Sequence, residues 1–186
     1  MKQLLRSVTM FTFLTLLTSG MYPLVVTGVA QLFPRKASGS LLYDSDKLVG
    51  SELIAQKFAD PRYFHCRPSA SDFATLPSGA SNAALTNRSW QESLSDRKRT
   101  LQLENPEQAL PADLLAASAS GLDPHISPAA AQFQIRRIAG SRGLSSDQIQ
   151  KIGALIEELT EKPQFGILGE ERVNVLLLNL RLDKSL

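Results

Sequence analysis

The chain has 186 residues, a formal net charge of +2 and a single cysteine. Lys2 and Arg6 account for this charge, because the other 18 Lys and Arg residues are balanced by all 18 Asp and Glu residues. The rest of the chain is neutral overall and lacks the cationic surface that nucleic-acid binding requires. A single cysteine excludes both an intrachain disulfide and a thiolate metal cluster.

The first feature along the chain is an uncharged apolar segment. Ser7 to Pro34 has no charged residue over 28 positions, and about 20 apolar residues suffice for a helix that crosses a bilayer. Pro23 removes one hydrogen bond from this helix, which nearby hydroxyl groups can compensate. The alternative is a signal peptide cleaved after residues 28–30, but the apolar region of a signal peptide spans only about 7–15 residues. The length favours a retained transmembrane helix.

The charges beside this segment indicate its orientation. Lys2 and Arg6 precede it, whereas the cations that follow it are accompanied by acidic residues. The excess of positive charge at the N-terminus favours a cytoplasmic N-terminus. We therefore predict a cytoplasmic tail over residues 1–6, a transmembrane helix over residues 7–34 and a single extracytoplasmic domain over residues 35–186.

The first part of this domain shows three patterns. Residues 44–58 fit an amphipathic helix, with acidic residues that can cap it and apolar residues at spacings of four or five. Residues 67–86 are rich in Pro, Ser, Gly, Ala and Asn, which predicts a long loop lying against the domain. The basic run Arg97–Arg99 lies among acidic residues and favours the solvated face of a helix.

Two further helices are expected in close succession. Ser127 and Pro128 provide a cap and a first-turn proline, and Gly140 or Gly143 can end the first helix. Ser145 is followed three residues later by a glutamine, which is the capping-box spacing, and then by a narrow apolar stripe. We expect these two helices to pack together.

The C-terminal segment from Arg172 to Asp183 alternates with the period of two that is typical of a strand. Half of its length is apolar on both faces, which favours an inner strand of a small sheet covered by helices. The expected fold class is therefore α/β, of the α+β-like kind: a soluble domain with a small helix-covered sheet, attached to one N-terminal transmembrane helix.

The densest motif is a loop of small hydroxyl residues, glycine and proline that precedes the predicted helix at Pro128. It comprises Ser118, Ser120, Gly121, Leu122, Asp123, Pro124 and His125, followed by Ile126 to Pro128. Such a loop could offer backbone amides to an anion, but serine and aspartate in loops most often bond their own backbone, which we favour. A catalytic hydroxyl assisted by His125 and Asp123 is less favoured, because neighbours in one short loop rarely converge as a triad.

Other site chemistry has little support in the sequence. His65, His125 and Cys66 lack the ligand spacing of a zinc site. The chain has neither a Gly-rich phosphate-binding loop nor a dinucleotide-binding motif. We therefore predict that this chain binds no metal and no cofactor of its own.

Short sequence motifs occur in a fixed order along nearly the whole chain. Besides the Ser118 to Pro128 loop, they include Arg67, Pro68, Ser69, Ser81, Asn82, Arg137, Arg142, Gly169, Arg172, Asn174 and Asn179. As a set they resemble the C-subunit family of the bacterial Kdp-type potassium-transporting ATPases. Cys66 and Ala80 stand where this family is expected to have glycine, so a tight turn there is expected to be arranged differently.

The resemblance implies a complex at the bacterial inner membrane. In it, a channel-like subunit binds potassium, a P-type ATPase subunit hydrolyses ATP, and this chain assembles with both as a non-catalytic accessory subunit. It also implies a chaperone-like effect on the pump's ATP affinity, linked to Ser118 to Gly121. A domain across a bilayer core about 30 Å thick cannot touch cytoplasmic ATP, so this effect would pass through partner helices. The alternative is a membrane-anchored periplasmic enzyme that uses the Ser118–His125 loop.

Overall fold

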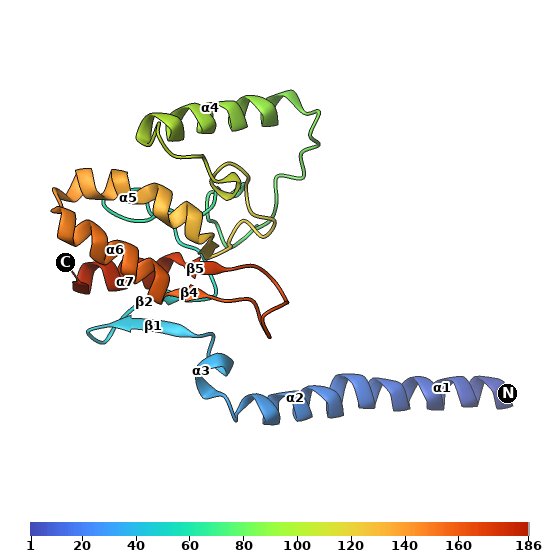
Figure 1. The fold of residues 1–186 in the computed structure, drawn as a ribbon. Helices are drawn as coiled ribbons and strands as arrows, with labels where there is room; N and C mark the ends of the chain where they lie inside the picture. The colour runs from blue at the N-terminus through green and yellow to red at the C-terminus, as the bar shows by residue number, and fades with distance from the viewer. Residues whose placement is uncertain (186) are drawn as a thin grey trace. The chain divides into compact units, whose positions relative to one another are not determined.

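The computed structural model describes residues 1–185, which divide into two compact units, Met1–Leu48 and a second unit that begins at Val49. The first unit contains a helix over Lys2–Ala30 that is long and apolar enough, by length and composition, to cross a membrane. It consists of α1 (Lys2–Thr15), a π-helical segment η1 (Leu16–Met21) and α2 (Tyr22–Ala30) (Figure 1). A short helix, α3, follows at Pro34–Ala37.

The π-helical segment has a local cause. Pro23 lies one residue after the start of α2 and has no amide to donate, so the regular hydrogen-bond ladder is interrupted at this turn. Thr18, inside the wide turn, donates its hydroxyl to the carbonyl of Leu14 at 2.7 Å. The helix predicted over residues 7–34 is thus present, but it begins at Lys2 and ends at Ala30, before Pro34.

The helix predicted over residues 44–58 is wrong. This part of the chain contains β1 (Leu41–Asp44) and β2 (Lys47–Ser51), which form a two-stranded sheet. Ser45 and Asp46 join them with φ of 48° and 68°, and two left-handed residues in succession are typical of a tight type I′ hairpin turn. Aspartate initiates turns as readily as it caps helices, and of the two acidic residues predicted as a cap, Asp44 ends β1 and Asp46 lies in the turn.

The second unit has a helical layer beside a small antiparallel sheet. The helices α5 (Pro128–Arg142), α6 (Ser146–Glu158) and α7 (Val175–Ser185) lie together, while β3 (His125–Ile126), β5 (Arg172–Asn174) and β4 (Thr160–Glu161) pair in that order (Figure 1). The inner strand is therefore β5, and the α+β fold class is confirmed. The core is formed by buried apolar side chains of these elements, including Ile126, Phe133, Ile138, Ile152, Ile156, Val173, Leu178 and Leu182.

The start and end signals of α5 and the start signal of α6 are confirmed. Ser127 accepts the amide of Ala130 at 3.0 Å, and α5 ends at Gly143, whose φ is 64°. Gly140, the other predicted end, lies inside α5. The capping box at the start of α6 is complete, since Ser145 and Gln148 each bond the other's backbone amide.

The predicted C-terminal strand is correct only for its first three residues. The backbone from Val175 to Ser185 is the helix α7. Asn174 explains the switch, because its side-chain oxygen accepts the amide of Leu177 at 3.1 Å and so caps the helix. The leucine-rich sequence fits both periods, but Leu is a strong helix former, and buried residues spaced at three and four face the core.

The remaining elements lie between the hairpin and β3. The predicted loop over residues 67–86 is confirmed, and α4 (Arg88–Glu104) follows it, with the short 3-10 helix η2 at Ala112–Leu114. Lys98 and Arg99 are exposed on α4, as the sequence predicts, whereas Arg97 is partly buried and donates to the carbonyl of Leu115 at 2.7 Å.

Candidate functional site

The Ser118–Pro128 loop lies where several distant segments meet. The amide of Ser118, a residue only 3% exposed, donates to the carbonyl of Pro68 at 3.0 Å. The carbonyl of Leu122 accepts the amide of Ala55 at 2.9 Å, and that of Pro124 accepts the amide of Val175 at the same distance. The backbone of this loop therefore holds together parts of the chain that are far apart in sequence.

The polar side chains of the loop bond its own backbone. Asp123 accepts the amide of His125 at 3.0 Å, and Ser120 accepts the amide of Leu122 at 3.1 Å. These are the Asx-type and Ser-type turns that the sequence favours. The imidazole of His125 lies 3.5 Å from Asp123 and 4.0 Å from Glu161.

Asp123 also forms an ion pair with Arg67, whose Nη1 lies 3.2 Å from the Asp123 carboxylate. Partial burial opposes ionisation of this carboxylate, but the hydrogen bonds from His125 and the positive charge of Arg67 outweigh it, so its pKa is lowered. Asp123 is therefore ionised at neutral pH and joins the loop to the segment that begins at Arg67.

Gly121 is required at its position for two reasons. Its φ of 72° lies in the left-handed region that favours glycine, and a Cβ atom there would lie 2.8 Å from the carbonyl oxygen of Gly79 and 3.0 Å from Oγ of Ser71. The predicted loop over residues 67–86 thus packs directly against the Ser118–Pro128 loop.

The end of the loop is fixed by Asp113 of η2. Its carboxylate accepts the amide of Ser127 at 2.8 Å and the Ser127 hydroxyl at 3.2 Å. Since Ser127 also caps α5, the loop and the start of this helix are set together.

Two buried amide side chains hold the neighbouring segment over residues 60–66. Asn179 of α7 accepts the amide of Phe64 at 2.8 Å and donates to its carbonyl at 3.0 Å. Gln134 of α5 bonds both backbone groups of His65 in the same way, at 2.8 and 3.1 Å. Asn179 was a predicted motif residue, but Gln134 was missed, although a polar residue on the apolar face of α5 was a usable signal.

Two arginines of α5 hold the same segment from the other side. Arg137 donates to the carbonyls of Pro61 and Tyr63 at 2.6 and 3.0 Å and pairs with Glu104 of α4 at 3.2 Å. Arg142 donates to the carbonyl of Arg62 at 2.8 Å.

Arg142 and Tyr63 also meet at the C-terminal helix. Arg142 pairs with Asp183 of α7 at 2.7 Å, and its guanidinium lies 5.0 Å from the centre of the Tyr63 ring. The Tyr63 hydroxyl donates to the same carboxylate at 2.9 Å, a bond that, together with burial, raises the pKa of Tyr63. The motif arginines thus connect α4, α5 and α7 through residues 60–66.

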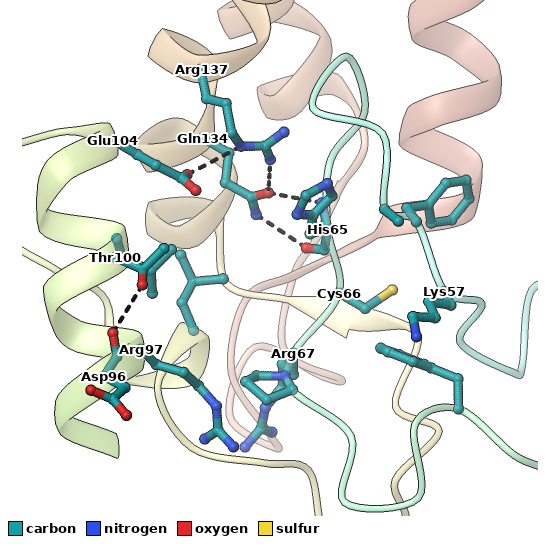
Figure 2. Close-up of a pocket in the computed structure, with 16 residues that line it drawn as sticks. Lys57, His65, Cys66, Arg67, Asp96, Arg97, Thr100, Glu104, Gln134 and Arg137 are labelled. Carbon is teal, nitrogen blue, oxygen red and sulfur yellow. Dashed lines mark hydrogen bonds and ion pairs between the residues drawn. The ribbon is translucent and has the colours of Figure 1, made fainter. Parts of the chain in front are cut away.

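A cleft of about 480 Å³ opens between α4 and this clamped segment. Figure 2 shows Glu104 and Thr100 of α4 on one side, Gln134 and Arg137 of α5 at the top of the view, and the side chains of Arg67 and Arg97 in its lower part. Nε of Arg67 is buried and has no hydrogen-bond partner within residues 1–185.

Two titratable side chains of the cleft, His65 and Cys66, are in their neutral forms at neutral pH. Burial and the charge of Arg137 lower the pKa of His65. Burial raises the pKa of the Cys66 thiol to about 12. Cys66 is therefore a partly buried thiol that stays protonated at neutral pH.

The other motif residues belong neither to the Ser118–Pro128 loop nor to the side chains that hold residues 60–66. Ser69 accepts the amide of Phe73 at 2.9 Å, and Ser81 and Asn82 are exposed on the 67–86 loop. Arg172 pairs with Glu161 across β4 and β5. Gly169 lies in the loop between these two strands, and Asn174 donates to the carbonyl of Glu52 at 2.7 Å. Within residues 1–185, no group of three or more His, Cys, Asp and Glu side chains could hold a metal ion.

Comparison with known proteins gives a consistent result. Residues 4–184 match the family described as KdpC, the c chain of the K+-transporting ATPase. A potassium-transporting ATPase KdpC subunit from Leptospira interrogans is 50% identical over 181 residues, which cover 96% of this chain and 92% of the relative. Subunits of the same name are 46% identical in Geotalea uraniireducens, over 99% of this chain and 98% of the relative, and 47% identical in Geobacter sulfurreducens, over 98% of each.

Proposed function

This chain belongs to the KdpC family and is a subunit of the K+-transporting ATPase complex, in which we propose that it acts as a non-catalytic accessory subunit. The observation that carries the proposal is the match over residues 4–184, which includes the apolar helix, the Ser118–Pro128 loop and the clamped segment. The function of the chain is therefore to be sought in assembly with other subunits and in potassium transport by the complex.

The proposed partners are a channel-like potassium-binding subunit and a P-type ATPase subunit that hydrolyses ATP. In this proposal the chain stabilises both, while ATP and potassium are handled by the complex. The exposed apolar helix over Lys2–Ala30 supports a role in the bilayer, because side chains of this kind can pack against lipid or against partner helices.

A non-catalytic role is supported by the bonding within the Ser118–His125 loop. Ser120 and Asp123 are engaged by backbone amides, and an activated hydroxyl would instead need a hydrogen bond to a base. The neutral His65 and the protonated Cys66 thiol in the cleft favour the same view. No observation favours the alternative of a periplasmic enzyme.

The proposed role of the Ser118–Pro128 loop is to join the chain segments through which this subunit docks onto its partner subunits. Gly121 fits closely against Gly79, and Asp123 is paired with Arg67, so a change in this loop would be felt in residues 67–86. We propose that an effect on the pump's ATP affinity, if exerted by this chain, is transmitted through partner helices rather than by contact with the nucleotide.

The proposed topology is a single-pass protein of the inner membrane with a cytoplasmic N-terminus and a periplasmic domain. Lys2 and Arg6 before the uncharged segment support it. A reporter fused after Arg35 should register on the outer side of the membrane and not in the cytoplasm. If the fused reporter instead registered in the cytoplasm, the domain would have the opposite orientation, and direct contact with ATP would be possible.

The accessory role is tested by purifying the complex through a tag on the ATPase subunit, with and without this chain. We expect the full-length chain to co-purify, and we expect potassium-stimulated ATP hydrolysis to fall when it is omitted. Unchanged hydrolysis without the chain, or failure of the unmodified chain to co-purify, would contradict the proposal.

A further inference from the structure

The loop between β4 and β5 carries an apolar surface that the fold does not cover. Phe165, Ile167 and Leu168 are 92%, 81% and 57% exposed. Single exposed apolar residues are common on proteins, but three large ones within four positions form a patch of the kind that marks interaction sites. We refer to Pro163–Gly169 as the β4–β5 tip.

The β4–β5 tip has a defined backbone. Gln164 and Leu168 exchange backbone hydrogen bonds of 2.8 and 2.9 Å, and the amide of Gly166 donates to the carbonyl of Pro163 at 3.0 Å. Such bonds limit the entropy that the tip would lose on binding. The apolar side chains are therefore presented on a pre-organised turn.

Phe165 is unusual in a second respect. Its φ is 55°, and a bulky residue in the left-handed region is an outlier whose strain must be compensated elsewhere. Phe165 as a whole is 92% exposed, so its side chain has few contacts within the second unit that could compensate this strain. Contact of the Phe165 ring with a partner would compensate the strain.

The charges beside the β4–β5 tip indicate the kind of partner. Glu170 and Glu171 are exposed and directly follow the tip, Lys162 precedes it, and Arg172 is already paired with Glu161. The excess charge is negative, which disfavours the anionic surface of a bilayer. A symmetric contact with a second copy would bring like charges together. An apolar pocket with Lys or Arg at its rim fits both the apolar residues and the charge.

We propose that the β4–β5 tip inserts into such a pocket on a partner subunit of the potassium-transporting complex, with Phe165 and Ile167 as its anchors. This inference rests on the proposed function, since it requires that the chain assembles with partner subunits. Aromatic and aliphatic anchors that enter a pocket contribute most of the affinity of many interfaces.

The first test compares two double variants of the full-length chain, each co-expressed with its partners and recovered through a tag on the ATPase subunit. In the tip variant, Phe165→Ser is combined with Ile167→Ser. In the matched control, Leu85→Ser is combined with Leu103→Ser, residues that are 75% and 80% exposed but stand singly. We expect recovery of the tip variant to fall at least about tenfold and that of the control to change by less than about twofold.

The second test identifies the occupant with the photoreactive p-benzoylphenylalanine in place of Phe165. Illumination of the complex should yield an adduct with the mass of this chain plus one partner subunit. Adducts with lipid or with a second copy of this chain would overturn the inference, as would equal recovery of the two double variants. If the unmodified chain co-purifies and the tip variant does so equally, only this inference fails. If the unmodified chain does not co-purify, the proposed function fails as well.

Discussion

Replacing Asp123 by alanine should loosen the Ser118–Pro128 loop. The substitution removes the acceptor for the His125 amide, a hydrogen bond that contributes about 1 kcal/mol. It also removes the ion pair with Arg67, in which both side chains are about 30% exposed and which contributes about 0.5–1 kcal/mol. The expected loss of local stability is therefore about 1.5–2 kcal/mol. Asp123→Asn is the matched control, because it keeps an acceptor for the amide and loses only the charge.

The assay is amide hydrogen exchange at His125 in the full-length chain in detergent. A loss of about 2 kcal/mol corresponds to about thirtyfold faster exchange for the alanine variant, and the asparagine variant should change by only about two- to fivefold. Equal exchange in both variants would refute the assignment of the turn bond. No acceleration in either would refute the architectural role of Asp123.

The ion pair also has a defined pH dependence. Because the folded-state pKa of Asp123 lies below its usual value of 3.8, its contribution to stability is complete above that pH and is lost as the pH falls through the folded-state pKa. The difference in stability between the wild type and Asp123→Asn should therefore persist from neutral pH down to about pH 4 and disappear in stronger acid.

Three further substitutions or reactions probe other parts of the second unit. Gly121→Ala should destabilise the chain by about 1–3 kcal/mol in urea unfolding, whereas Gly140→Ala, whose Cβ would meet nothing within 4 Å, should be neutral or stabilising. Cys66 should resist a thiol reagent at pH 8 in the native chain and react fully in urea, because burial raises its pKa to about 12. Gln134→Leu should cost about 2–4 kcal/mol by leaving two backbone groups unpaired, and Gln132→Leu on the same helix should cost less than about 1 kcal/mol.

Local signals predicted the elements whose ends carry distinctive chemistry. Ser127 and Gly143 mark α5, and the Ser145 capping box marks α6, because these residues satisfy backbone groups that no helix can satisfy by itself. The inner position of β5 was predicted from its apolar composition, whereas the π-helical segment before Pro23 was not predicted. The end signals of the helices depend on neighbours in sequence, so a sequence alone contains them.

The errors occurred where one pattern fits two structures. The leucines after Asn174 satisfy the period of a strand and that of a helix, and the capping bond of Asn174 favours the helix. Ser45 and Asp46 were likewise compatible with a cap and with a turn. The clamp on residues 60–66 could not be predicted, because Gln134 and Asn179 reach partners 69 and 115 residues away in sequence. The sequence identified Arg137 and Arg142 as motif residues, but it did not indicate that both bond backbone carbonyls of residues 60–66.

The central claim, that the chain supports the pump without performing chemistry, is tested most directly by potassium-stimulated ATP hydrolysis of the purified complex, normalised to the amount of this chain that co-purifies. Ser118, Ser120 and His125 are each replaced by alanine in turn. The account predicts graded losses of activity that follow the losses of assembly, because the loop is architectural. A single substitution that abolishes turnover by several orders of magnitude while assembly stays intact would contradict it.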